Sequence, residues 1–227
     1  MSLKNRKVVV TGGPTREWID PVRYISNASS GKMGIALADA AGPRCAETVF
    51  VHGPIERSLL EGRPYRTVAV ETTGELLDAV MREIDGSAVL IMAAAPADYR
   101  PASKSPVKIK KDDEHLTIDL VKNPDILMAV VARRAAEPEM EGLYTAGFAA
   151  ETHDAEAFAR EKLAYKNLDM ICLNDVGKPG AGFSVDTNIM TVFTRRGARV
   201  ELALASKRDI AVRILDLIES DMGARKL

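Results

Sequence analysis

The chain has 227 residues, of which 46% are hydrophobic and 28% are charged, and these values exclude the disordered, collagenous and membrane-embedded classes. The 31 basic residues nearly balance 32 acidic ones, so the formal net charge of -1 gives no global attraction to nucleic acid or to an anionic membrane. We therefore expect a folded protein in which any anion site is local.

The N-terminal segment is charged and then continues with only three valines, 8–10, before a glycine turn. This run is too short for the core of a signal peptide or for a membrane span. Together with the charge balance, it predicts a cytoplasmic protein with neither nucleic-acid nor membrane partners.

Short apolar runs alternate with amphipathic stretches along the chain, which is typical of βα units around a mainly parallel sheet. Thr72 with Glu75 forms a capping-box pattern, and Asn123 ahead of Pro124 marks another helix start. The prediction is a single α/β domain over 1–227, with a Rossmann-like sheet flanked by helices. Strands are predicted at 7–11, 48–51, 67–70, 88–95, 143–149 and 169–173, and helices at 34–41, 75–84, 124–136, 155–165 and 207–218.

Two stretches depart from this alternation. Residues 105–121 are predicted to form paired short strands around a polar turn, and residues 188–204 a hairpin that turns at Arg195, Arg196 and Gly197. We predict that both leave the main sheet and form a small β extension.

Two loops rich in small residues follow the first predicted strand. The strand ends in Gly12 and Gly13, at the carboxyl edge where open α/β sheets bind ligands. The stretch ISNASSGKMG at 25–34 then leads into a helix, and its amides, serines and positive helix end suit a phosphate. Both patterns are also typical of plain turns and capped helix starts. The second is not a Walker A loop, because Ser26 and Met33 occupy its glycine and hydroxyl positions.

A dinucleotide-dependent oxidoreductase is the obvious competitor for this fold class. The first loop lacks the G-x-G-x-x-G spacing, and the second strand ends in His52 and Gly53 without a ribose-binding acid. No tyrosine precedes a lysine by four positions, no G-x-S-x-G elbow occurs, and the three histidines lack metal-ligand spacing. These absences disfavour nicotinamide, serine-hydrolase and metal-centred chemistry.

Further candidates follow in the second half of the chain. The run 93–100 ends the most apolar strand with tiny side chains and then Asp98, which suits a flat base but is also typical of a turn cap. Strand alternation at 107–111 puts Lys108 and Lys110 on one face, as solvated edge strands also do. Lys162 and Lys166 are spaced to share one helix face.

Taken together, these motifs resemble the phosphopantothenate–cysteine ligase family over residues 7 to about 218. The resemblance implies a Rossmann-like sheet with a dimerisation extension, for which 105–121 and 188–204 are the candidates, and hence a homodimer. Bacterial members often carry a flavin-dependent decarboxylase domain ahead of the ligase, which has no counterpart here, so the chain is either a stand-alone ligase or an excised domain. The motifs are, in order, DPVRYISNASSGKMG, AAAPADYRP, KIKK, LVKNPDIL, AGFAAET and KLAYKNLD.

The family's reaction forms an acyl-cytidylate from 4′-phosphopantothenate and CTP, and cysteine then displaces CMP to give 4′-phosphopantothenoylcysteine. Eukaryotic relatives use ATP, and the sequence leaves the choice of nucleotide open. The resemblance also implies Mg²⁺, which neutralises the triphosphate and is held mainly by phosphates and water. No dedicated protein metal site is predicted.

The resemblance also implies residue roles. Lys108 stabilises charge on the triphosphate as the acyl-cytidylate forms, and Asn27 hydrogen-bonds the acyl intermediate during cysteine attack. Pro96 departs from the valine of many relatives and removes an amide donor. Nucleotide contacts are expected from Ala93, Ala94, Asp98, Lys108, Pro124, Asp125, Ile126, Leu127, Phe148, Lys162 and Lys166. Phosphopantothenate contacts are expected from Gly12, Gly13, Ser29, Ser30 and Gly31.

Two rival functions make different predictions. A non-catalytic nucleotide-binding module binds CTP without releasing pyrophosphate when phosphopantothenate is supplied. An oxidoreductase gives a nicotinamide optical signal on titration.

Overall fold

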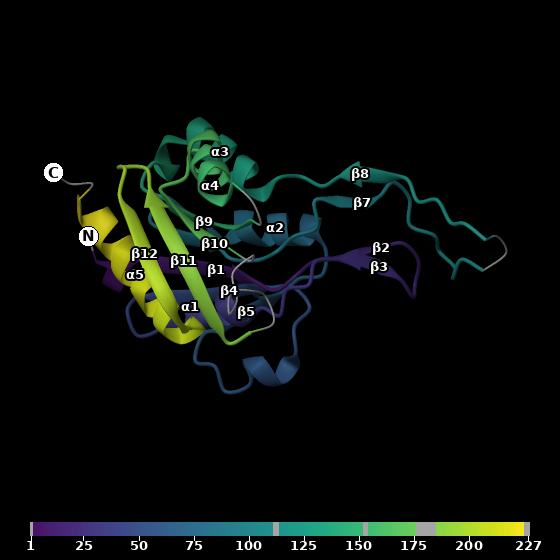
Figure 1. Cartoon of the computed structure of the whole chain (residues 1–227), viewed down its shortest axis with the longest axis horizontal. Coiled ribbons are helices and arrows are strands. Elements are labelled where there is room, and N and C mark those ends of the chain that lie inside the picture. The colour runs from purple at the N-terminus through teal and green to yellow at the C-terminus, as the bar shows by residue number, and fades with distance from the viewer. Residues whose placement is uncertain (1, 111–113, 152–153, 176–184, 225–227) are drawn as a thin grey trace.

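A single eight-stranded sheet forms the centre of the molecule (Figure 1). The computed structural model describes every residue except 1, 111–113, 152–153, 176–184 and 225–227. The strands are β1 Lys7–Gly12, β4 Glu47–His52, β5 Arg66–Ala69, β6 Val89–Met92, β9 Tyr144–Glu151, β10 Met170–Asp175, β11 Thr187–Thr194 and β12 Arg199–Ser206. Their order is β12-β11-β10-β9-β6-β1-β4-β5, parallel from β5 to β10 and antiparallel through β11 and β12. The six predicted strands and the parallel sheet are confirmed.

Helices cover both faces of this sheet, and all five predicted helices are confirmed. They are α1 Lys32–Ala41, α2 Thr73–Glu83, α3 Ile126–Ala136, α4 Ala155–Tyr165 and α5 Lys207–Ala224, with short 3₁₀ helices at Leu3–Asn5, Arg57–Leu60 and Pro138–Met140. Alternate residues of β1 face opposite layers, as strand geometry requires. Val8 and Val10 join the core under α1 and α5, whereas Val9 joins the core under α2, α3 and α4.

The N-caps of α2 and α3 can be compared with the capping patterns predicted from the sequence. Thr72 and Glu75 form the predicted capping box at α2. The predicted start of α3 is wrong by two residues, because Asp125 rather than Asn123 is the N-cap and accepts the amide of Met128 at 3.1 Å. Asn123 instead donates its side-chain amide to the carbonyl of Ala97 at 2.8 Å. None of the helices in the described part of the chain combines the length and apolarity that crossing a bilayer requires.

Two small antiparallel hairpins project from the main body (Figure 1). The first joins β2 Arg16–Trp18 to β3 Tyr24–Ser26, and the second joins β7 Tyr99–Pro101 to β8 Leu120–Lys122. We call residues 16–26 and 99–122 the extension. Strand pairing within 105–121, as predicted, is wrong for most of that segment. Of its described residues only 120 and 121 lie in a strand, whereas 105–110 and 114–119 are irregular.

The hairpin predicted at 188–204 is confirmed as β11 and β12, but the prediction that it leaves the main sheet is wrong. β11 pairs with β10 in antiparallel register, from Met170 opposite Thr194 to Asn174 opposite Met190. Buried side chains such as Val192 continue the core under this hairpin. The hairpin therefore forms one edge of the main sheet, and only the extension projects.

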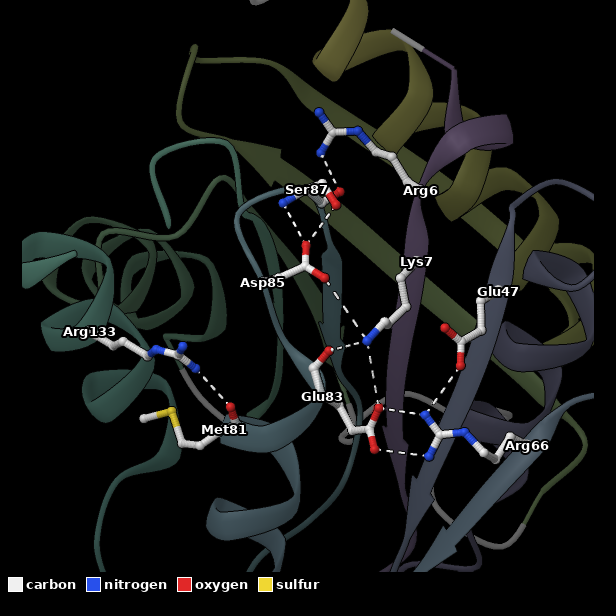
Figure 2. A network of polar contacts seen from close by, with 9 residues as sticks. All are labelled: Arg6, Lys7, Glu47, Arg66, Met81, Glu83, Asp85, Ser87 and Arg133. Carbon is white, nitrogen blue, oxygen red and sulfur yellow. Dashed lines mark hydrogen bonds and ion pairs between the residues drawn. The ribbon is translucent and has the colours of Figure 1, made fainter. Parts of the chain in front are cut away.

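A charged network links the amino ends of β1, β4 and β5, as Figure 2 shows. Arg66 on β5 forms two hydrogen bonds to the Glu83 carboxylate, at 2.9 and 2.6 Å, and a third to Glu47 at 3.2 Å. Lys7 on β1 donates to the backbone carbonyl of Glu83 at 3.0 Å. The network ties the C-terminal end of α2 to the sheet at its amino edge, which leaves the carboxyl edge for ligands.

Candidate active site

A cleft of about 860 Å³ lies at the carboxyl ends of β6, β9 and β10. Its walls come from residues 27–34, 92–99, 122–127 and 148–150. The order β9-β6-β1-β4 makes this region a topological switch point, because α1 follows β1 on one face of the sheet while α3 precedes β9 on the other. Open α/β sheets bind ligands at such points.

Most of the residues predicted from sequence line this cleft. Lys108, Gly12 and Gly13 are not among its lining residues. Gly12 lies behind the wall, where a Cβ on it would come within 3.2 Å of the Cα of Gly34 in α1. The predicted residues that line the cleft are Asn27, Ser29, Ser30, Gly31, Ala93, Ala94, Asp98, Pro124, Asp125, Ile126, Leu127, Phe148, Lys162 and Lys166.

Asn27 contacts the loop that follows β6. Its side-chain amide donates to the carbonyls of Ala95 at 3.2 Å and Pro96 at 3.0 Å. Proline keeps its carbonyl, so Pro96 is compatible with this contact. Thr15 holds the same loop, because its Oγ1 accepts the amide of Ala97 at 2.9 Å. The Asn27 side chain is therefore attached to a loop that is itself bonded to the first strand's loop.

Two lysines from α4 and its C-terminal end meet the N-terminus of α3 at one end of the cleft. Lys166 Nζ lies 2.6 Å from the carboxylate of Asp125, the α3 N-cap, and Lys162 donates to the carbonyl of Phe148 at 3.1 Å. Partial burial raises the pKa of the Asp125 carboxyl, but the hydrogen bonds from Lys166 and from the amide of Met128 outweigh it, so this pKa lies below its usual value. Cationic side chains beside a helix N-terminus suit a polyphosphate. We call this the α3/α4 side of the cleft.

Lys108 is exposed on the extension, in a segment attached to the turn between β2 and β3. The amide of Ser105 donates to the carbonyl of Ile19 at 2.9 Å. Next to Lys108, the amide of Ile109 donates to the buried carboxylate of Asp20 at 3.2 Å, and its carbonyl accepts from Arg23 at 3.0 Å. These contacts replace the strand pairing that the sequence predicts for this segment.

Asp20 is the centre of this attachment. Arg23 donates to its carboxylate through Nε at 2.9 Å and Nη2 at 2.5 Å, and the amide of Val22 donates at 2.8 Å. The Arg23 guanidinium holds the pKa of the Asp20 carboxyl well below its usual range, against the opposing effect of burial. Asp20 therefore remains charged at neutral pH and orders the backbone at Ile109, next to Lys108.

Several polar residues that line the cleft were not predicted as site residues, among them Lys32, Asn174, Asn188 and Lys207. Asn174 directly follows the predicted strand 169–173, and Lys207 begins the predicted helix 207–218. Both therefore lie at the carboxyl edge of the sheet. Because open α/β sheets bind ligands at that edge, their positions in the sequence could have identified them as candidates.

Comparison with known proteins gives consistent matches. Residues 3–222 match the protein family described as DNA/pantothenate metabolism flavoprotein C-terminal domain. The chain is 45% identical over 222 residues to the coenzyme A biosynthesis bifunctional protein CoaBC of Vibrio cholerae, covering 97% of this chain and 54% of that protein. It is 42% identical over 216 residues to the Bacillus subtilis protein of the same name, covering 95% and 52%.

A solved structure matches over nearly the whole chain. The crystal structure of the C-terminal domain of CoaBC has a TM-score of 0.77 and 35% sequence identity, and the match covers 98% of both chains. The chain therefore spans about half the length of the curated relatives it matches and corresponds in fold to their C-terminal domain.

Proposed function

The chain belongs to the family of the DNA/pantothenate metabolism flavoprotein C-terminal domain, and on that basis we propose that it is a phosphopantothenate–cysteine ligase of coenzyme A biosynthesis. The reaction joins 4′-phosphopantothenate to cysteine through an acyl-cytidylate. Attack of the substrate carboxylate on the α-phosphorus of CTP releases pyrophosphate. Attack of the cysteine amine on the resulting carbonyl then releases CMP, and the amine gives up its proton.

One observation carries this proposal: a single cleft of about 860 Å³ contains both a polyphosphate-type site and Asn27. Pockets of this size hold drug-sized ligands. Lys162, Lys166 and the N-terminus of α3 fit a triphosphate, and the small residues Ala93 and Ala94 leave room for a flat base. Asn27 would hydrogen-bond the acyl intermediate while cysteine attacks. No nucleophilic serine or cysteine is required, because CMP is a good leaving group.

Mg²⁺ belongs to the proposal through the triphosphate. The side chains at the α3/α4 side are two lysines and an aspartate already paired with one of them, which is the chemistry of a phosphate site rather than of a cation site. The ion would therefore be held by phosphate oxygens and water. When bound, it neutralises charge on the triphosphate and on the departing pyrophosphate.

We propose further that the chain acts as a homodimer in which the extension supplies Lys108 to the cleft of the second copy. Exposed large hydrophobic side chains are concentrated on the extension, and Val107, next to Lys108, is 68% exposed. Apolar side chains grouped on a projecting surface are typical of a protein interface. The group comprises Val22, Tyr24, Tyr99, Val107, Leu116, Leu120 and Val121.

Mixing two inactive variants tests this arrangement. In a mixed dimer of Lys108→Gln and Asn27→Asp subunits, one cleft combines the intact Asn27 of one chain with the intact Lys108 of the other. Random mixing after subunit exchange should therefore restore about a quarter of wild-type activity, since half of the dimers are mixed and each has one intact site of two. No restoration after demonstrated exchange would show that Lys108 acts within its own chain.

The same variants test the ligase function itself. Pyrophosphate release should require phosphopantothenate, and condensed product should also require cysteine, with CTP preferred over ATP. Lys108→Gln should abolish pyrophosphate release, whereas Asn27→Asp should accumulate the acyl-cytidylate. Nucleotide binding without pyrophosphate release in a folded dimer would instead favour a non-catalytic binding module.

The relatives are named as bifunctional proteins. We propose that a flavin-dependent decarboxylase accompanies this ligase, in the same polypeptide or as a separate protein, and that both act in the cytoplasm. The product of the ligase is a cysteine amide with a free carboxylate, which is a substrate suited to such a decarboxylase.

A further inference from the structure

Three buried residues at one wall of the cleft form a closed ring of hydrogen bonds. Thr15 Oγ1 accepts the amide of Ala97 at 2.9 Å, and the Thr73 hydroxyl donates to the carbonyl of Ala97 at 3.3 Å. The two threonine Oγ1 atoms lie 2.9 Å apart. A hydroxyl has one hydrogen to donate, so Thr15 is the donor between them, because Thr73 gives its hydrogen to Ala97. Each hydroxyl donates once and accepts once, and the ring holds both backbone groups of Ala97.

Glu17 fixes the position of Thr73 from the extension. Thr73 is the first residue of α2, where a backbone amide has no acceptor within its own helix. The Glu17 carboxylate on β2, only 4% exposed, accepts this amide at 2.8 Å. A negative charge is also favourable at a helix N-terminus. Next to Glu17, the Arg16 amide donates to the carbonyl of Glu71 at 2.7 Å. The chain entering α2 is therefore attached to β2 at two points.

The ring lies next to the two carbonyls that Asn27 contacts. Asn27 donates its side-chain amide to Ala95 and Pro96, and the amide of Ala95 donates to the carbonyl of Gly13 at 2.9 Å. Pro96 has no amide hydrogen, so Ala97 carries the next backbone donor of this segment. Gly13 thus holds one end of the segment 95–97, and the ring holds the other end.

We propose that Thr73 is a positioning residue for the step in which cysteine attacks the acyl-cytidylate. This inference rests on the ligase function proposed above. Through the ring, Thr73 fixes the segment 95–97 and thereby the orientation of the Asn27 side chain toward the acyl intermediate. Although Thr73 lines the cleft, its hydroxyl is engaged in the ring, so it acts through Ala97 and not on a bound ligand. Glu17 contributes by holding the backbone of Thr73.

The test measures the two half-reactions separately in the full chain. Pyrophosphate release from CTP and phosphopantothenate without cysteine reports formation of the acyl-cytidylate, and rapid addition of cysteine then reports its consumption. Thr73→Val removes the hydroxyl and should slow consumption roughly 3- to 10-fold, the effect of one buried hydrogen bond. Pyrophosphate release and the KM for CTP should stay close to wild type. The slowing is limited because the Ala97 carbonyl also accepts the Asn123 side-chain amide at 2.8 Å.

Conservative variants show whether these hydrogen bonds cause the effect. Thr73→Ser keeps the hydroxyl and should retain most of the wild-type rate of consumption. Glu17→Ala leaves the Thr73 amide without its acceptor and should slow the same step. Glu17→Gln keeps an oxygen acceptor for that amide and should therefore react at close to the wild-type rate.

Two further variants keep the test decisive. Thr72→Ala is the matched control, because it weakens the start of α2 at the neighbouring residue and leaves the ring intact; both half-reactions should proceed at wild-type rates. Thr15→Val opens the ring from its other side and should slow consumption at least as much, even where Thr73→Val folds poorly. Equal slowing of both half-reactions in the folded ring variants, an unchanged rate of consumption, or a raised KM for CTP in its place would overturn the inference. Failure of the wild type to release pyrophosphate would count against the ligase function instead.

Discussion

The tight packing of α1 against β1 at Gly34 predicts a measurable defect in Gly34→Ala. A Cβ on Gly34 would lie 2.8 Å from the Cα of Gly12, 2.9 Å from the carbonyl oxygen of Thr11 and 3.0 Å from the ring of Phe50. Two of these atoms belong to the backbone of the central strand β1 and cannot rotate away. Overpacking of this kind lowers the free energy of unfolding by about 2–3 kcal/mol. The higher helix propensity of alanine relative to glycine offsets about 1 kcal/mol of this loss.

The expected net loss is about 1–2 kcal/mol, which corresponds to a Tm lower by roughly 3–6 °C for a chain of this size. Because α1 is displaced at its ligand-facing end, the KM for phosphopantothenate should also rise. Thermal unfolding with parallel kinetics measures both. Gly74→Ala is the matched control, since a Cβ there meets nothing closer than Thr72 Oγ1 at 3.9 Å, and it should stabilise α2 by about 0.5–1 kcal/mol. A Tm for Gly34→Ala at or above wild type would refute the reasoning.

Three further predictions follow from other contacts. Thr72→Ala removes the α2 capping box and should cost about 1 kcal/mol in guanidinium unfolding; an unchanged midpoint would contradict it. The hydrogen bond from Arg66 lowers the pKa of the Glu83 carboxyl below 4.5, against the opposing effect of burial. The stability that this pair contributes is therefore present above pH 4.5 and is lost as the pH falls through the lowered pKa. Arg66→Gln should flatten this dependence on acid when the free energy of unfolding is measured from pH 7 to 3. Lys166→Ala should raise the KM for CTP about tenfold, and an equal rise for phosphopantothenate would argue against an α3/α4 nucleotide site.

Local patterns predicted the main elements because each strand and helix buries a face set by its own periodicity. The α3 start shows where local information ends. Asn123 and Asp125 are both good caps, and the contact of Asn123 with Ala97, 26 residues away, decides between them. The hairpin at 188–204 was predicted from its turn. Its pairing with β10 could not be predicted in this way, because that contact depends on the tertiary fold.

The candidate site divides in the same way. Residues in continuous motifs, such as Ser29 to Gly31, line the cleft together because neighbouring residues share a loop. Lys108 lies away from it, because Asp20 attaches the adjacent Ile109 to a turn 89 residues earlier. Asn174 and Lys207 lie on separate elements and belong to no motif. Sequence patterns therefore could not predict that the order of the strands brings them to the same cleft.

Transfer of an oxygen isotope tests the central claim most directly. Phosphopantothenate labelled with ¹⁸O in its carboxylate is incubated with CTP, Mg²⁺, cysteine and the protein, and the nucleotide products are analysed by mass spectrometry. An acyl-cytidylate leaves the bridging carboxylate oxygen on phosphorus when cysteine attacks the carbonyl, so one ¹⁸O should appear in CMP for each condensed product. Label in inorganic phosphate with release of CDP, or condensed product with unlabelled CMP, would contradict the proposed reaction.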